Sequence, residues 1–181
     1  MSVDLVFSYT NGGAAISGNV DHGNISNGLT TTAIEVFIRH TGINSITACG
    51  LYVRQYSGTY NGDASAALDI AELLAWGDAS TSASFGGFQI NMDATGAYSA
   101  SAWPTYSSKS PTNGFVCRTG IGDSEANAVS ITTATGATAT GTIQAGSSPN
   151  VRLKCRVQVP SDEDTVGVRQ FDQVVVFTYT S

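Results

Sequence analysis

The sequence predicts an all-β fold, an antiparallel β-sandwich or barrel of the jelly-roll kind with one short helix, on three observations. Residues 151–159 alternate without interruption between apolar and polar side chains, as a half-buried strand requires. Asn-Gly pairs begin at positions 11, 27, 61 and 113, and this dipeptide readily adopts the positive φ angles of a tight hairpin turn. Short candidate strands follow one another at about 8 to 12 residues, the spacing typical of sandwiches and barrels.

A single β domain is expected over residues 1–181. A chain of this length buries roughly 70% of the surface that its unfolded form exposes, and it is short for two full domains. Apolar residues make up 41% of the chain and charged residues only 12%, so hydroxyl and amide groups must keep the surface hydrated. The net charge of -6 argues against a nucleic-acid partner, because binding phosphates requires a basic surface.

The start of the chain and its cysteines bear on the cellular setting. The first residues, Met-Ser-Val-Asp, show no signal-peptide pattern, and no window approaches the roughly 20 apolar residues of a membrane span. We therefore expect synthesis in the cytoplasm without Sec-dependent export, and no membrane partner. The cysteines, Cys49, Cys117 and Cys155, are odd in number and far apart, which argues against a disulfide framework. They are expected to be buried apolar positions or free thiols.

Two runs early in the chain predict a hairpin. Residues 34–39, IEVFIR, place three β-branched side chains on one face, and residues 46–54, ITACGLYVR, form a second run. The segment between them, TGINS at 41–45, is typical of a turn. Paired antiparallel, the two runs would be neighbouring strands of one sheet.

One stretch departs from the strand pattern. Residues 64–76, ASAALDIAELLAW, are rich in Ala and Leu, follow Asp63 as a candidate N-cap and stop at Gly77, which suits a C′ position. They predict a short helix that lies across a sheet or bridges its edges. The predicted apolar stripe comprises Leu68, Ala71, Leu74 and Ala75. Because Ile70 and Leu73 widen this stripe, a buried irregular segment is the alternative.

Further strands are expected in the second half of the chain, at 85–91, 114–119, 128–133, 140–145 and 151–159. The last of these ends at Pro160, which lacks the N–H that a strand ladder needs. Bulky side chains are scarce over 130–148. That segment fits two interpretations, an exposed strand pair turning at Thr135-Gly136 or a flexible loop.

The two ends of the chain carry similar runs, VFSYT at 6–10 and VFTYT at 176–180. Their flanking residues do not match, so a shared environment explains the similarity better than a duplication does. Each run alternates aromatic with small hydroxylated positions and predicts a terminal strand. If the two strands pair antiparallel, one register sets Phe7 opposite Tyr179 and Tyr9 opposite Phe177, within the domain or between subunits.

Few residues have the chemistry of a catalytic site. A nucleophile needs a base within hydrogen-bond reach, and only His22 and His40 could serve. Neither accompanies a nucleophile motif, so both are interpreted as surface histidines. The run Gly120-Ile121-Gly122-Asp123 lacks the third glycine of a dinucleotide fingerprint and is interpreted as a turn. No catalytic residue and no cofactor are assigned.

Carboxylates gather in two places, around the predicted helix and after Pro160. The residues are Asp63, Asp69, Glu72 and Asp78 in the first cluster and Asp162, Glu163 and Asp164 in the second. Calcium takes about six to eight oxygen ligands, yet neither cluster has the spacing of a calcium-binding loop. No metal site is assigned, and a solvated turn is the simpler interpretation of the second cluster.

Aromatic side chains are the remaining candidates for an interaction surface. The segment YSASAWPTYSS at 98–108 is polar enough to hold Trp103 and Tyr106 outside, where their rings could bind a sugar or a partner. A place in the core or in a subunit contact is the alternative for Trp103. Trp76 follows an apolar run and is expected in the core.

Two stretches resemble small virion proteins of tailed bacteriophages, IEVFIRHTGINSITACGLYVRQYSGTY at 34–60 and AELLAWGDASTSASFGGFQIN at 71–91. In size and charge the chain is most similar to the capsid cement, or decoration, class. The resemblance implies a β-rich dimer or trimer that sits on the outer surface of the phage head. There it would join neighbouring copies of the major capsid protein, as a component of the virion without enzymatic activity.

Three hypotheses about function follow. The leading one is a non-enzymatic cement protein whose partners are itself and the major capsid protein. The alternative is a carbohydrate- or receptor-binding module of a phage tail, which would use Trp103 and Tyr106. The third is a hydrolase that uses two of the clustered acids, although nothing in the sequence sets the distance between them.

Overall fold

The computed structural model describes residues 5–10, 12–42, 46–79, 86–91, 114–131, 151–164 and 166–179. These residues form eight strands, one α-helix and a short 3-10 helix at Glu125–Asn127. The strands are β1 (Leu5–Ser8), β2 (Ile34–His40), β3 (Ile46–Gln55), β4 (Gly87–Asn91), β5 (Phe115–Val116), β6 (Val129–Ser130), β7 (Val151–Gln158) and β8 (Phe171–Tyr179), and the helix is α1 (Ala66–Asp78).

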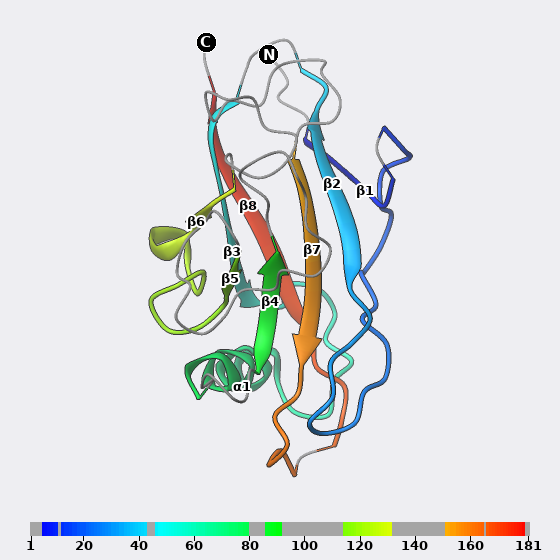
Figure 1. The fold of residues 1–181 in the computed structure, drawn as a ribbon, viewed down its shortest axis with the longest axis vertical. Helices are drawn as coiled ribbons and strands as arrows, with labels where there is room; N and C mark the ends of the chain where they lie inside the picture. The colour runs from blue at the N-terminus through cyan, green and yellow to red at the C-terminus, as the bar shows by residue number, and fades with distance from the viewer. Residues whose placement is uncertain are drawn as a thin grey trace.

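The strands build two antiparallel sheets, one behind the other in Figure 1. The larger sheet has the order β1-β2-β7-β4-β5, and the smaller has the order β6-β3-β8. The predicted all-β, sandwich-like fold with one helix is therefore confirmed. In the described part of the chain neither sheet closes into a barrel.

The core lies between the inner faces of the two sheets. On β7 the predicted alternation is observed, since Leu153 and Cys155 are fully buried. Contacts cross from sheet to sheet: the Phe88 and Phe171 ring centroids are 5.0 Å apart in an edge arrangement, and the Gln173 amide lies 3.8 Å from the Cys155 sulfur. Cys49, Cys117 and Cys155 are all free and buried, so they occupy the apolar positions expected of them.

The predicted hairpin between 34–39 and 46–54 is wrong. Both segments are strands, but β2 pairs with β1 and β7, whereas β3 pairs with β6 and β8. The chain thus crosses from one sheet to the other after β2, and the two strands face the same core from opposite sides. Alternation specifies which side chains are buried, but it does not specify which strand is the neighbour.

The terminal runs are strands, as predicted, but they do not pair with each other. Phe7 on β1 lies opposite Ile38 of β2, and Phe177 on β8 lies opposite Cys49 of β3. The proposed register of Phe7 with Tyr179 within the domain is therefore wrong. The two runs are similar because each packs an aromatic side chain against the common core from its own sheet.

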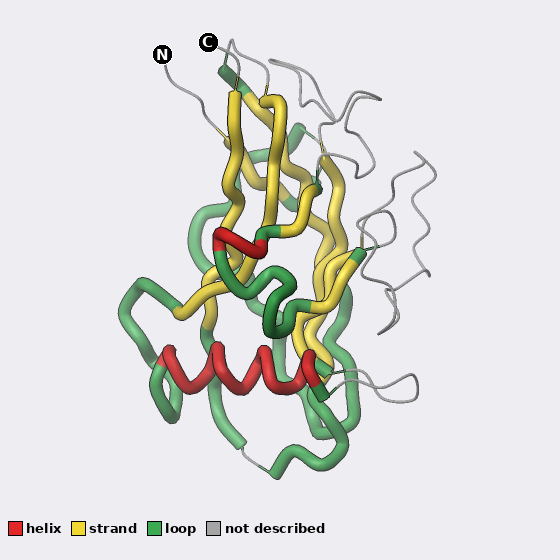
Figure 2. The backbone as a smooth tube through the Cα atoms, turned by 90° about the vertical axis from the view of Figure 1, so that its left-hand side faces the viewer, coloured by secondary structure: helices red, strands yellow, loops and turns green. Residues whose placement is uncertain are grey.

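Helix α1 lies across one end of the sandwich, below the strands in Figure 2, and contacts β4 of one sheet and β3 and β8 of the other. The predicted helix is therefore present, and it contacts both sheets where the sequence suggested a position across one sheet or at its edges. Its N-cap is Ser65, not Asp63, because the Ser65 hydroxyl accepts a hydrogen bond from the Leu68 N–H at 3.2 Å. Asp63 instead accepts the Val168 N–H at 2.8 Å.

The buried face of α1 differs from the predicted stripe. The helix buries Asp69, Leu73 and Gly77, which are spaced four residues apart, and it leaves Leu68 62% exposed. The helix also continues through Gly77, which is not a C′ residue. A β-carbon at Gly77 would lie 2.1 Å from the Cys117 carbonyl oxygen, so glycine is needed here for close packing of the helix against residues 114–131.

The other predicted strands are found in shortened form. Strand β4 falls within 85–91, β5 within 114–119 and β6 within 128–133. The strand predicted at 140–145 lies outside the described residues, and so does most of the segment 130–148.

Replacing Gly77 by alanine is expected to destabilise the protein by about 1 to 3 kcal/mol, because the new methyl group overpacks the contact with Cys117. In a solvent-exposed helix the same change would stabilise by about 1 kcal/mol, so the sign of the effect is diagnostic. Chemical denaturation measures it. The exposed Ala75→Gly variant on the same helix serves as control for helix propensity, and a stabilised Gly77→Ala protein would contradict the packing described here.

Candidate functional site

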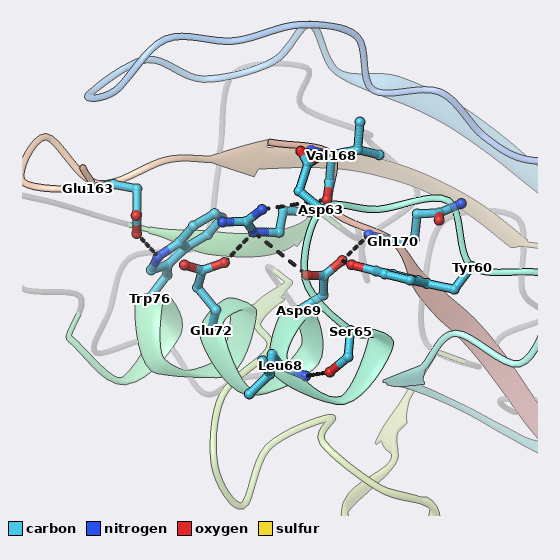
Figure 3. Close-up of polar contacts among 11 residues, drawn as sticks. Tyr60, Asp63, Ser65, Leu68, Asp69, Glu72, Trp76, Glu163, Val168 and Gln170 are labelled. Atoms are coloured by element: carbon cyan, nitrogen blue, oxygen red, sulfur yellow. Dashed lines mark hydrogen bonds and ion pairs between the residues drawn. The ribbon is translucent and has the colours of Figure 1, made fainter. Parts of the chain in front are cut away.

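Members of the two carboxylate clusters of the sequence meet at the end of the sandwich that α1 covers (Figure 3). Asp78 of the first cluster instead accepts hydrogen bonds from Thr119. Asp69 and Glu72 come from the helix, and Glu163 comes from the loop that follows β7. The cation between them is Arg169, which approaches both Asp69 and Glu72. The fold thus joins acids that are about ninety positions apart in the chain around one guanidinium group.

Asp69 is the most buried acid of this network, with 3% of its surface exposed. Its Oδ2 accepts the Tyr60 hydroxyl at 2.7 Å and the Gln170 backbone N–H at 2.8 Å. Its Oδ1 lies 3.8 Å from Arg169 Nε and makes no hydrogen bond to the described residues. The fold can bury this negative charge because two donors and one cation compensate it.

Arg169 is held chiefly by Glu72, whose carboxylate accepts a hydrogen bond from the guanidinium Nε. This bond and the negative charges of Glu72, Asp69 and Glu163 raise the pKa of Arg169 despite its partial burial. Desolvation and the hydrogen bond to Asp69 likewise raise the pKa of Tyr60. Both shifts favour the protonated donors that the Asp69 and Glu72 carboxylates require.

Further bonds tie the neighbouring loops to this network. The indole N–H of Trp76 donates to the Glu163 carboxylate at 2.8 Å, and the Asn27 side chain donates to the Glu163 carbonyl oxygen. Trp76 also packs against the core, so its expected place there is confirmed, with the indole nitrogen at the polar border. Nearer the start of the helix, the Gln170 side chain accepts the Asn61 backbone N–H at 2.7 Å (Figure 3).

The arrangement is suited to holding loops. Each carboxylate of the network accepts a hydrogen bond from the same chain. The bonds join α1 to the segment that precedes it and to the loop that follows β7. The described residues contain no group of three or more His, Cys, Asp or Glu placed to hold a metal ion. These bonds hold the loops against α1, which contacts both sheets at this end of the sandwich.

Both histidines differ from the surface residues that the sequence suggested. His40 is only 1% exposed, because it continues the inward face of β2 after Val36 and Ile38. His22 is half-buried, with its ring edge-on to Phe88 at 5.8 Å. Burial lowers the pKa of His22, and the nearby Asp21 only partly offsets this effect. The inward alternation of residues 34–40 was the signal that could have identified His40 as buried.

The run Gly120–Asp123 is a turn, as predicted. Arg118 and Ile121 form an isolated bridge around it, and Gly120 and Gly122 adopt positive φ angles of 78° and 65°. The Asp123 carboxylate accepts the Gly120 N–H at 2.7 Å. Partial burial of Asp123 opposes ionisation, but the hydrogen bonds from Gly120, Asn127 and Ser124 outweigh it and lower the pKa of Asp123.

The residues proposed for an interaction surface, Trp103 and Tyr106, lie outside the described residues. Sequence reasoning found the acids of the network but missed Arg169 and Gln170 as their partners. No local pattern marks these two residues, because Asp69 lies about a hundred positions away and belongs to another element. The bond from the Tyr60 hydroxyl to Asp69 was not foreseen either, although the two residues are nine positions apart.

Comparison of the chain with protein-family models, with curated proteins and with solved structures gives no match. Within the described residues, no helix has both the length and the apolar character needed to cross a membrane.

Replacing Asp69 by asparagine is expected to destabilise the fold by about 2 kcal/mol or more, because Arg169 loses a buried counter-charge. A double-mutant cycle with Arg169→Met should give a coupling of about 1 to 3 kcal/mol. The Arg54–Asp172 pair is the matched control, since its Arg side chain is 52% exposed, and its coupling should stay below about 1 kcal/mol. Equal couplings for the two pairs would contradict a structural role for Asp69.

The half-buried His22 is expected to make the protein acid-sensitive. Because the pKa of His22 is lowered in the folded state, its neutral form stabilises the fold above the unfolded pKa of 6.5, and this stability is lost as the pH falls through the folded pKa. Urea denaturation at a series of pH values between about 7 and 5 tests this. The His22→Leu variant should show a shallower decline, and an unchanged pH slope would contradict the assignment.

Proposed function

We propose that the protein is a non-enzymatic structural component of a virion, a capsid cement protein that binds the outer surface of a phage head. The observation that carries this proposal is that the acidic side chains at the helical end form hydrogen bonds within the chain. Asp63, Asp69, Glu72 and Glu163 each accept a hydrogen bond from another part of the same chain. They tie loops to a helix at one end of a two-layer sheet structure.

This bonding supports the proposal because a cement protein must resist deformation while it joins shell subunits. The loops at the helical end are linked by bonds between residues far apart in sequence, including Val168 with Asp63 and Gln170 with Asp69. Such links limit local opening of the loops. The resemblance to small virion proteins and the low content of charged residues, 12%, support the same role.

The helical end also offers apolar surface for the major capsid protein. Leu68 on α1, Leu29 before β2 and both Val166 and Val168 before β8 are exposed large apolar side chains. Hydrogen bonds hold these segments together, from Val168 to Asp63 and from Asn27 to Glu163. Exposed apolar side chains on segments joined by hydrogen bonds are candidates for contact with another protein. We therefore assign the capsid contact to this end of the molecule.

The number of copies in purified virions tests the proposal. Gel densitometry against the major capsid protein should give a copy number of the same order as that of the shell subunits, because a cement protein covers the whole lattice. A small fixed number of copies per particle would instead favour the tail module, for which binding of a glycan should require Trp103 and Tyr106. Absence from purified particles would contradict both functions.

A further inference from the structure

Strand β8 is an edge strand of the smaller sheet. It pairs with β3 along its whole length, from Gln55 opposite Phe171 to Ile46 opposite Tyr179. None of the described residues pairs with the other edge of β8. Every second residue of such a strand directs its N–H and C=O groups away from the sheet, so within the described part of the chain these groups of β8 have no strand partner.

This edge lacks the features that normally protect an edge strand. Its sequence, FDQVVVFTY, is nine residues long and contains neither proline nor lysine. Its one charged residue, Asp172, is engaged by Arg54 and Ser57. The single irregularity in its pairing with β3 lies at the far end, between Ile46 and Ala48. A long and regular apolar edge of this kind is a template for another strand.

The core is also incompletely covered along β8. Phe171, Val175 and Phe177 pack against the core but are only partly buried. Their neighbours on β3, Leu51 and Val53, are fully buried. The difference shows that the apolar layer remains accessible to water at the β8 edge, where one more strand would cover it.

We propose that β8 pairs antiparallel with β8 of a second copy of this chain, around a two-fold axis at Val175. Only registers that keep odd residues opposite odd residues place the core-facing side chains of both copies on one face. Among these, the register centred on Val175 pairs all nine residues of the strand. A two-fold contact of this kind uses the same surface of both subunits.

The side chains of β8 are complementary to themselves in this register. Phe171 faces Tyr179 of the second copy, an aromatic cross-strand pair, and Val174 faces Val176. Asp172 is the one charged residue of the strand and faces Thr178, so no like charges come together. Sequence and symmetry therefore favour a second copy over an unrelated strand.

The inference does not depend on the proposed capsid role. It concerns the chain in isolation, and it assigns self-association to the β8 edge and leaves the helical end for the capsid. Failure of the dimer would leave the copy-number test of the capsid role unaffected.

The mass of the purified protein in solution is the first test. Light scattering coupled to gel filtration should give twice the 18.7 kDa of one chain. Hydrogen exchange of the β8 amides should slow as the concentration rises, because pairing protects the outward N–H groups. A protein that stays monomeric at high concentration overturns the proposal.

A charge exchange tests the register. In the proposed dimer, position 174 of one copy faces position 176 of the other. The double variant V174K/V176K places lysines opposite each other in both copies and should weaken dimerisation at least about 100-fold, whereas V174K/V176E places opposite charges together and should dimerise like the wild type. Both variants alter the same two half-buried positions, and circular dichroism checks that each is folded. If the two folded variants dimerise equally well, the proposed register is wrong.

Discussion

Leu153 and Cys155 of β7 and Leu51 and Val53 of β3 share one apolar layer, and the other elements are placed by the need to cover it. Each strand can bury only one face, so two sheets must meet face to face. Helix α1 covers one end of the layer, and residues 114–131 pack against the helix through the close contact at Gly77. Along β8 the side chains that pack against this layer are only partly buried.

The helical end shows how an acidic chain can close such a layer. Helix α1 carries Asp69 on its buried face together with Leu73, although a buried carboxylate is costly unless it is compensated. Arg169 and the Tyr60 hydroxyl compensate its charge, and their contacts with Asp69 hold two loops against the helix. The acid therefore specifies where these loops lie. The described residues thus form a helical end joined by polar contacts and a smaller sheet in which β8 is an edge strand.

Predictions from local pattern were confirmed where neighbouring residues alone decide the structure. The alternation of residues 151–159 correctly identified β7 and its buried face, and Ala- and Leu-rich residues correctly identified α1. The helix boundaries moved by about two residues because Ser65 is a better hydrogen-bond acceptor for the first turn than the more distant Asp63, which the Val168 N–H engages. The predicted apolar stripe on the helix was wrong because Asp69 lies on the buried face. The sequence does not show that Arg169 compensates the charge of Asp69 there.

What the sequence by itself determined was the approximate position of each strand that the described residues form and of the single helix, because these depend on the spacing of apolar side chains along a few neighbouring residues. Only the tertiary structure decided that β2 and β3 belong to different sheets and that the two terminal strands do not pair. It alone brought the two acid clusters together around Arg169. The physical reason is that strand pairing and ion pairing over a hundred residues are chosen by the packing of the whole domain, and no local pattern records that choice.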